Sequence, residues 1–219
     1  TCRKMMFEAF QIAGAWFVYD SAELTLSTFI KDVAPVYNKK LMDAGLKRAY
    51  TSAAASLVNS VACTAWAGLS IATGHYTIPY FSLSYFVYDT ARGVDRSMVV
   101  HHLVSFILIS ASTSSEETET AAPYVLLSEF STVFLNMLVI LCGPTTSSQR
   151  LNLSLSEERT KATLKKLFFA SFFFTRMLVL PGAFYWLMMK RQLVVTSVLF
   201  PLVCLNVHWF FKLLKKVNN

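Results

Sequence analysis

The sequence predicts an all-α fold, a polytopic transmembrane helix bundle with six or seven spanning helices. The first observation is composition: 54% of the 219 residues are hydrophobic and only 15% are charged, against about 25% charged in an average soluble domain. The second is a series of long apolar segments, and the third is the uneven distribution of basic residues between the segments that connect them. The four cysteines lie far apart without metal-site spacing, so we expect reduced thiols.

A spanning helix needs about 20 mostly apolar residues, because the hydrocarbon core of a bilayer is about 30 Å thick. The segments closest to this requirement are, in chain order, Ala53–Thr73, Met98–Ser112, Pro123–Cys142, Leu167–Met189 and Leu193–Phe211. Two weaker segments bring the total to seven. Phe7–Ile30 is interrupted by acidic residues, and an amphipathic interfacial helix is its alternative. Tyr76–Ala91 is short and carries Asp89.

Basic residues gather on one side of a seven-span topology. They follow the first, third and fifth spans and end the chain, whereas the loops after the second and fourth spans carry none. Only Lys190, Arg191 and the N-terminal residues lie on the other side. The positive-inside rule therefore predicts a cytoplasmic C-terminus, and an anionic leaflet facing these loops explains the net charge of +7. No nucleic-acid-binding motif accompanies the dispersed basic residues, so we expect no nucleic-acid partner.

The whole chain is predicted to form one membrane domain. Residues 1–49 would provide an N-terminal membrane segment and a basic cytoplasmic loop, and residues 50–216 the core of the bundle. The first residue is Thr rather than Met, so we expect the natural chain to begin upstream. No cleavable signal peptide is visible, because Arg3 and Lys4 lead into a stretch that contains Glu8 and Asp20.

Ionisable residues inside the spans are the candidate functional groups, because they are costly in a bilayer and usually face a protein interior. The candidates for catalysis are Asp89, His101, His102 and Glu129. Adjacent histidines on a helix point about 100° apart, so one can face a cavity while the other packs between helices. A neutral imidazole can act as base, nucleophile or proton relay. The residues predicted to line a polar cavity for lipid are Thr132, Asn136, Arg176 and Asn206.

The spacing of these residues adds two expectations. Glu129, Thr132 and Asn136 lie at i, i+3 and i+7, so they share one helix face that should point into the bundle. A buried Arg176 needs an anionic partner, for which Glu129 and Asp89 are the candidates; an ion pair that only orders the bundle is the alternative. The sequence contains no phosphate-binding loop and no metal-binding motif, so we expect no metal and no resident cofactor.

These motifs resemble the TLC-domain family, which includes ceramide synthases, translocon-associated TRAM proteins and smaller TLC domain-containing proteins. The matching runs are Tyr85 to Asp89, Met98 to Ser105 with the paired histidines, Ser128 to Thr132 with Asn136, Phe173 to Arg176 with Pro181, and Leu205-Asn206 with Trp209-Phe210. The resemblance extends from about Tyr50 to Lys216. It implies an integral, multi-pass membrane protein, with the endoplasmic reticulum favoured and the plasma membrane as the alternative.

The resemblance also implies a lipid-related function. In ceramide synthases the paired histidines are implicated in acyl transfer from acyl-CoA to a sphingoid base, and the matching positions are His101 and His102. That group also carries a His-Asp and a further Asp in the following span, where this chain has Ser128-Glu129 and Ser131-Thr132. The chain is therefore more similar to the smaller TLC domain-containing proteins, which are associated with membrane lipid composition.

Three functions remain open at this point. The first is membrane lipid homeostasis, with a lipid held in an intramembrane cavity. The second is a histidine-dependent lipid N- or O-acyltransferase, for which acyl-CoA would be the co-substrate. The third is association with the translocon or its cargo, which predicts indifference to the histidines. Membrane lipids are the expected partners.

Overall fold

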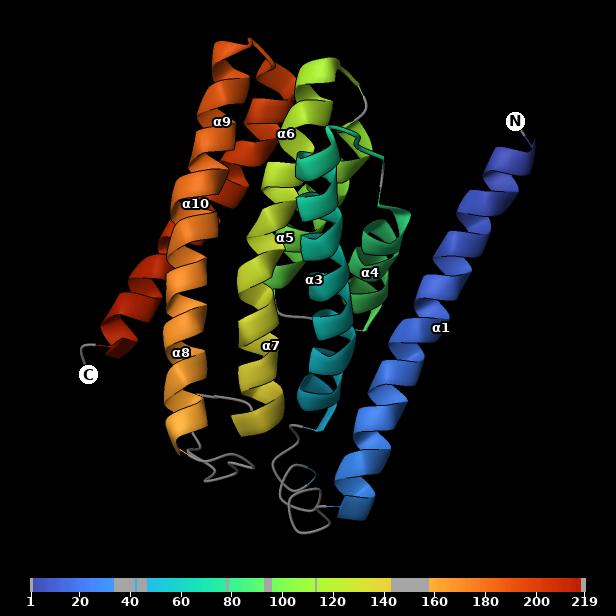
Figure 1. The fold of residues 1–219 in the computed structure, drawn as a ribbon, viewed down its shortest axis with the longest axis vertical. Coiled ribbons are helices and arrows are strands. Elements are labelled where there is room, and N and C mark those ends of the chain that lie inside the picture. Colours follow the sequence, from blue (N-terminus) through green and yellow to red (C-terminus); the bar gives the residue numbers. More distant parts are fainter. Residues whose placement is uncertain are drawn as a thin grey trace.

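The computed structural model describes residues 2–33, 42, 47–77, 79–92, 96–112, 114–142 and 158–217. These residues form helices and no strand, which confirms the predicted all-α class. The described helices make seven rods (Figure 1): α1 (Cys2–Val33), α3 (Lys47–Thr73), α4 (Tyr80–Ala91), α5 (Arg96–Ala111), α6 (Glu116–Leu126) continued by η1 (Leu127–Glu129) and α7 (Phe130–Cys142), α8 (Glu158–Phe172) continued by η2 (Phe173–Val179) and α9 (Leu180–Met189), and α10 (Leu193–Val217).

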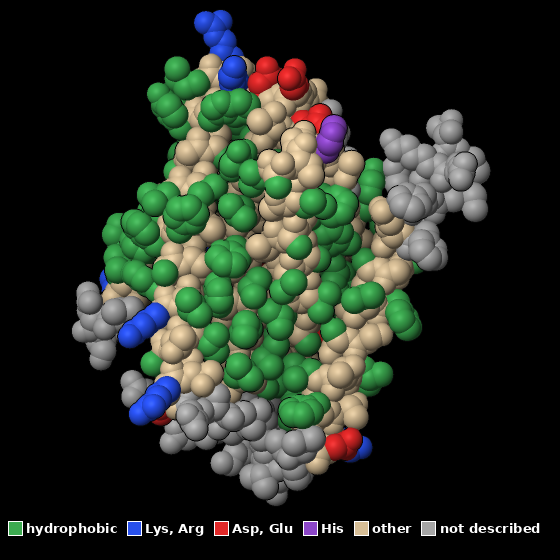
Figure 2. Space-filling view, viewed as in Figure 1, with side chains coloured by type: hydrophobic (Ala, Val, Ile, Leu, Met, Phe, Trp, Pro, Cys, Tyr) green, Lys and Arg blue, Asp and Glu red, His purple; other side chains and the backbone are tan. Residues whose placement is uncertain are grey.

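Several rods have the length and composition of membrane spans. Four of the described helical stretches are long and apolar enough: Tyr50–Thr73, Glu116–Leu141, Glu158–Met189 and Leu193–Lys215, with Met98–Ala111 as a shorter apolar helix. Figure 2 shows apolar side chains over the middle of one face and charged side chains toward its two ends. This arrangement fits an integral membrane protein. The two weaker predicted spans, which correspond to α1 and α4, fall in neither group.

The fifth rod begins earlier than the sequence predicts, at Glu116 instead of Pro123. The reason is a capping box. The Ser115 hydroxyl accepts a hydrogen bond from the Thr118 backbone N–H at 3.2 Å, and the Thr118 hydroxyl accepts one from the Ser115 backbone N–H at 3.0 Å. Acidic residues in the first turn further stabilise this helix end. The loop between the fourth and fifth predicted spans is therefore shorter than the sequence analysis indicates, because residues 116–122 are helical.

Six of the rods form a closed ring. Following the ring, α3 packs against α6–α7, then come α8–α9, α10, α5 and α4, and α4 returns to α3. The rod α1 lies outside this ring, against α3 and α4 (Figure 1). The ring therefore has an interior bounded by helices from distant parts of the sequence, and that interior is where the candidate residues gather.

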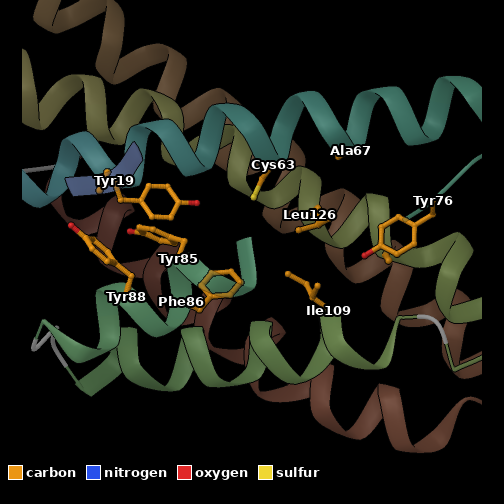
Figure 3. Packing of buried hydrophobic residues seen from close by; sticks show 11 residues of the cluster. Tyr19, Cys63, Ala67, Tyr76, Tyr85, Phe86, Tyr88, Ile109 and Leu126 are labelled. Atoms are coloured by element: carbon orange, nitrogen blue, oxygen red, sulfur yellow. The ribbon is translucent and has the colours of Figure 1, made fainter. Parts of the chain in front are cut away.

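An aromatic cluster attaches α1 to the ring. The side chain of Tyr19, from α1, is only 2% exposed. Its ring centroid lies 5.4 Å from that of Tyr85 and 5.5 Å from that of Tyr88, both on α4 (Figure 3). The Tyr19 hydroxyl donates a hydrogen bond to the Phe81 carbonyl at 2.9 Å. Contacts of this kind add to the free energy gained by burial, so α1 is a firmly packed part of the structure.

Most of the predicted basic loops lie outside the described residues, which omit 34–41, 43–46 and 143–157. The helix ends that flank them, of α1, α3, α7 and α8, lie toward the same end of the bundle as the C-terminus (Figure 1). The Lys190–Arg191 turn and the N-terminus lie toward the other end. This arrangement has the sidedness that the seven-span topology requires, and a cytoplasmic C-terminus stays a prediction.

Candidate functional site

A guanidinium group lies buried in the interior of the ring. Arg176 is 5% exposed and comes from η2. Its Nε donates to the Ser131 hydroxyl at 2.9 Å and to the Ser128 carbonyl at 3.2 Å. Its Nη1 donates to Asn206 Oδ1 at 2.9 Å, and its Nη2 to the Thr132 hydroxyl at 2.8 Å. Three rods thus converge on one cation, and the neutral oxygens satisfy most of its donors.

Irregular helical turns on two rods position this network. The segment η1 is a 3₁₀ turn and contributes Ser128 and Glu129, whereas η2 is a seven-residue π-helix that contains Arg176. Pro181 follows η2 within α9, and its missing N–H removes one backbone hydrogen bond from the helix. Such departures from α-helical geometry are frequent at functional sites.

Glu129 connects this cation to the first histidine. Its Oε1 lies 3.8 Å from Arg176 Nη2 and 3.6 Å from His101 Nε2. None of the three side chains is more than 9% exposed. Of the two carboxylates predicted as candidate partners of Arg176, Glu129 is the one that lies beside it in the structure. A carboxylate shared between a guanidinium and an imidazole keeps its charge compensated inside the bundle.

The second ring nitrogen of His101 makes no hydrogen bond to the described residues. Nδ1 is buried and has no hydrogen-bond partner among the described residues. With the hydrogen on Nε2, directed at Glu129, the neutral imidazole has its lone pair at Nδ1. A carboxylate that fixes the tautomer of a histidine while its other nitrogen stays available is the arrangement of a general base.

His102 differs from His101 because both of its ring nitrogens have partners. Nε2 lies 3.6 Å from Asp89 Oδ2, and Nδ1 lies 3.3 Å from the Thr90 hydroxyl. The Asp89 carboxylate also accepts a hydrogen bond from the Tyr85 hydroxyl. The centroids of the His101 and His102 rings are 5.6 Å apart. The structure thus brings all four predicted catalytic candidates together, as two histidine–carboxylate pairs.

Asn136 does not join this cluster, although Glu129 and Thr132 do. Its Nδ2 donates to the Ser56 hydroxyl of α3 at 2.8 Å. Asn136 lies one turn beyond Thr132, and at that level α7 is packed against α3. Asn136 is thus buried in the bundle, as its helix face predicts, but it contacts α3 and not the network around Arg176; its place in a lipid cavity stays a prediction. Conversely, the sequence analysis did not identify Ser131 as a partner of Arg176, because a single hydroxyl in an apolar helix is a weak signal. Its position three residues after Ser128, on the same helix face, was the feature that could have indicated it.

The interior around the site is closely packed. A cavity of about 10 Å³ adjoins Ser105, Ser128 and Glu129, and a second one of about 20 Å³ shares Ile109 and Val125 with it. Each has room for about one water molecule. Neither of these two cavities is large enough for a lipid, so a lipid could occupy this part of the interior only if side chains or helices moved.

A family model described as the TLC domain matches residues 48–215. The matched segment contains every candidate residue from Asp89 to Asn206 and leaves out α1. No curated protein and no solved structure matches the chain.

Proposed function

Since the chain belongs to the TLC-domain family, we propose that it sets membrane lipid composition by transferring an acyl chain to a lipid hydroxyl or amine inside the ring. The observation that carries this proposal is the chain of contacts from Arg176 through Glu129 to His101. It ends at an imidazole nitrogen that has no partner in the part of the chain that the structure describes. The resemblance of His101 and His102 to the paired histidines of ceramide synthases supports this proposal, although the chain differs from that group around Glu129.

In the proposed reaction, His101 Nδ1 accepts the proton of the acceptor hydroxyl or amine as its oxygen or nitrogen attacks the thioester carbonyl of acyl-CoA. The bond to sulfur breaks, and the imidazolium returns the proton to the leaving thiolate, so the products are acylated lipid and CoA. Glu129 stabilises the transient imidazolium, and Arg176 holds Glu129 in place. General base catalysis of this kind contributes about 10²- to 10⁴-fold in rate.

The pair of His102 and Asp89 has a positioning role in this proposal. The centroid of the His102 ring lies 5.3 Å from that of Phe86 and 5.8 Å from that of Tyr85. Because both of its nitrogens already have partners, His102 fixes the start of α5, from which His101 also projects. Loss of His102 should therefore disturb the geometry of His101.

A second candidate function is a role in lipid homeostasis without catalysis. The observation that favours it is the closed interior, where the two cavities hold about one water each. In this alternative the buried ion pair of Arg176 and Glu129 only orders the ring, and lipids contact its outer surface.

The deciding experiment compares His101→Ala with wild type at matched expression. The purified protein is reconstituted in liposomes with isotope-labelled acyl-CoA and a mixture of lipids that carry free hydroxyl or amino groups. His208→Ala, in which an exposed histidine of α10 is removed, serves as the matched control. We expect the control to form labelled lipid at the wild-type rate and His101→Ala to lose at least 100-fold, the lower end of general base catalysis.

The same variants are then tested by lipidomics in cells that lack the protein. If His101→Ala restores the lipid profile as fully as wild type does, catalysis at this histidine is wrong and the non-catalytic function replaces it. If only the control restores the profile, the lipid species that differ identify the acceptor.

A further inference from the structure

Two carboxylates from outside the family domain reach the edge of the candidate site. Asp20 and Glu23 belong to α1, which the TLC-domain match does not include. Both bind Arg92, at the end of α4: Asp20 Oδ1 lies 2.7 Å from Arg92 Nη2, and Glu23 Oε2 pairs with Arg92 Nη1. One guanidinium of the ring is thus held by two acids of a neighbouring rod.

An aromatic residue fixes the geometry of this cluster. The Tyr88 hydroxyl donates to Asp20 Oδ1 at 2.8 Å, and the Arg92 guanidinium lies 4.5 Å from the centroid of the Tyr88 ring. This cation–π contact and the two ion pairs direct the Arg92 side chain toward α1. Tyr88 is also one of the packed tyrosines that dock α1 on the ring (Figure 3).

Arg92 is also close to a residue of the candidate site. It caps α4, and its backbone N–H donates to the Asp89 carbonyl at 3.1 Å. Residues three apart at a helix end lie on the same face and can form an ion pair. Asp89, however, is the partner of His102 at 3.6 Å. The direction of the Arg92 side chain therefore decides whether this carboxylate stays with the histidine.

We propose that Asp20 and Glu23 are positioning residues, which hold Arg92 on α1 and so keep Asp89 paired with His102. The Arg92 side chain is 37% exposed, so its guanidinium is partly buried and is best stabilised by a carboxylate partner. Without the two acids of α1, Arg92 turns to Asp89 and draws it away from His102. The inference rests on the proposed function, because it assigns to α1 a role in the same site. It also gives Asp20 and Glu23 a specific role within α1.

The test uses three variants: Asp20→Asn/Glu23→Gln, Arg92→Gln, and the triple substitution. Acyl transfer to lipid should fall at least tenfold in the double variant, because Arg92 is then released. It should stay near the wild-type rate in Arg92→Gln. The triple variant should recover to within about threefold of Arg92→Gln, because no guanidinium remains to compete for Asp89. Asp32→Asn, an exposed acid of the same helix, is the matched control.

Two outcomes overturn the inference. Full activity in the double variant means that the acids do not position Asp89. Failure of the triple variant to recover, with Arg92→Gln active, means that the acids act by docking α1 and not through Arg92.

A second readout does not depend on turnover. The ¹⁵N resonances of the His102 ring report its hydrogen bonds, and a His102→Gln sample assigns them. They should shift in the double variant and return in the triple variant. If wild type transfers no acyl chain but these resonances behave as expected, the proposed function fails while the role of α1 in positioning Asp89 stands. If the resonances are the same in all variants, the inference about Arg92 is wrong whatever the activity.

Discussion

Replacing Arg176 by Met should strongly destabilise the folded protein. Met has a similar length but no charge, so Glu129 would lose its cationic partner in a site where its side chain is 9% exposed. Removing one member of a buried ion pair costs about 3–5 kcal/mol in free energy of unfolding, mostly because the remaining charge is uncompensated. The Asn206 amide and the Ser128 carbonyl, which now accept hydrogen bonds from Arg176, would also lose a donor.

The assay is thermal unfolding in detergent followed by tryptophan fluorescence, since the Trp209 ring lies 5.9 Å from the Arg176 guanidinium. For a chain of this length about 1 kcal/mol corresponds to about 2–4 °C in Tm, so a loss of roughly 6–20 °C is expected. Adding Glu129→Gln should recover at least half of it, because no unpaired charge then remains. Arg159→Met, an exposed position on the same rod, is the control.

Two outcomes would refute this reasoning. A Tm for Arg176→Met within about 2 °C of the Arg159→Met control would show that the ion pair carries little stability. A double variant no more stable than Arg176→Met would show that the uncompensated charge of Glu129 is not the cause of the loss.

Three further outcomes are expected. Asn206→Leu should lower the free energy of unfolding by about 1–3 kcal/mol, because Arg176 loses an acceptor; a Tm unchanged from wild type would contradict this. Asn136→Leu should cost stability through its lost hydrogen bond to Ser56, yet leave lipid transfer per folded molecule unchanged, and a selective loss of transfer would place Asn136 in the site after all. A glycosylation acceptor inserted beside Ser115 should be modified and one at the C-terminus should not, as a gel shift in microsomes will show; the reverse pattern would invert the topology.

The all-α fold was predictable because long apolar segments in the sequence determine where the membrane helices form. The long apolar segments that became α3 and α10 needed no knowledge of packing. The end of α4 at Ala91 was as predicted, but its start was placed four residues too early, at Tyr76 instead of Tyr80, because Pro79 at the N-cap lies within an apolar stretch. Helix ends that depend on side-chain caps, such as Ser115, were placed too late, because the acidic residues after it resemble a loop.

The members of the site were predictable, but not how they pair. Ionisable residues are rare in apolar segments, so Glu129 and His101 stood out. That His101 pairs with Glu129, and His102 with Asp89, depends on which rods are neighbours in the ring, and hydropathy does not encode that order. Arg92 is one of the basic residues that follow the third predicted span, and its partners were not predictable because they lie about 70 residues earlier in the chain.

The short length of α4 and α5 has a consequence for the surrounding bilayer. With 12 and 16 residues, these neighbouring helices span about 18 and 24 Å, less than the hydrocarbon thickness of about 30 Å. If these two helices cross the bilayer, hydrophobic mismatch of this size is relieved by local thinning of the membrane. On this side of the ring, lipid head groups and water would then lie closer to the second turn of α5, which contains His101 and His102. An acceptor lipid could then present its polar group to the histidines without leaving its own leaflet.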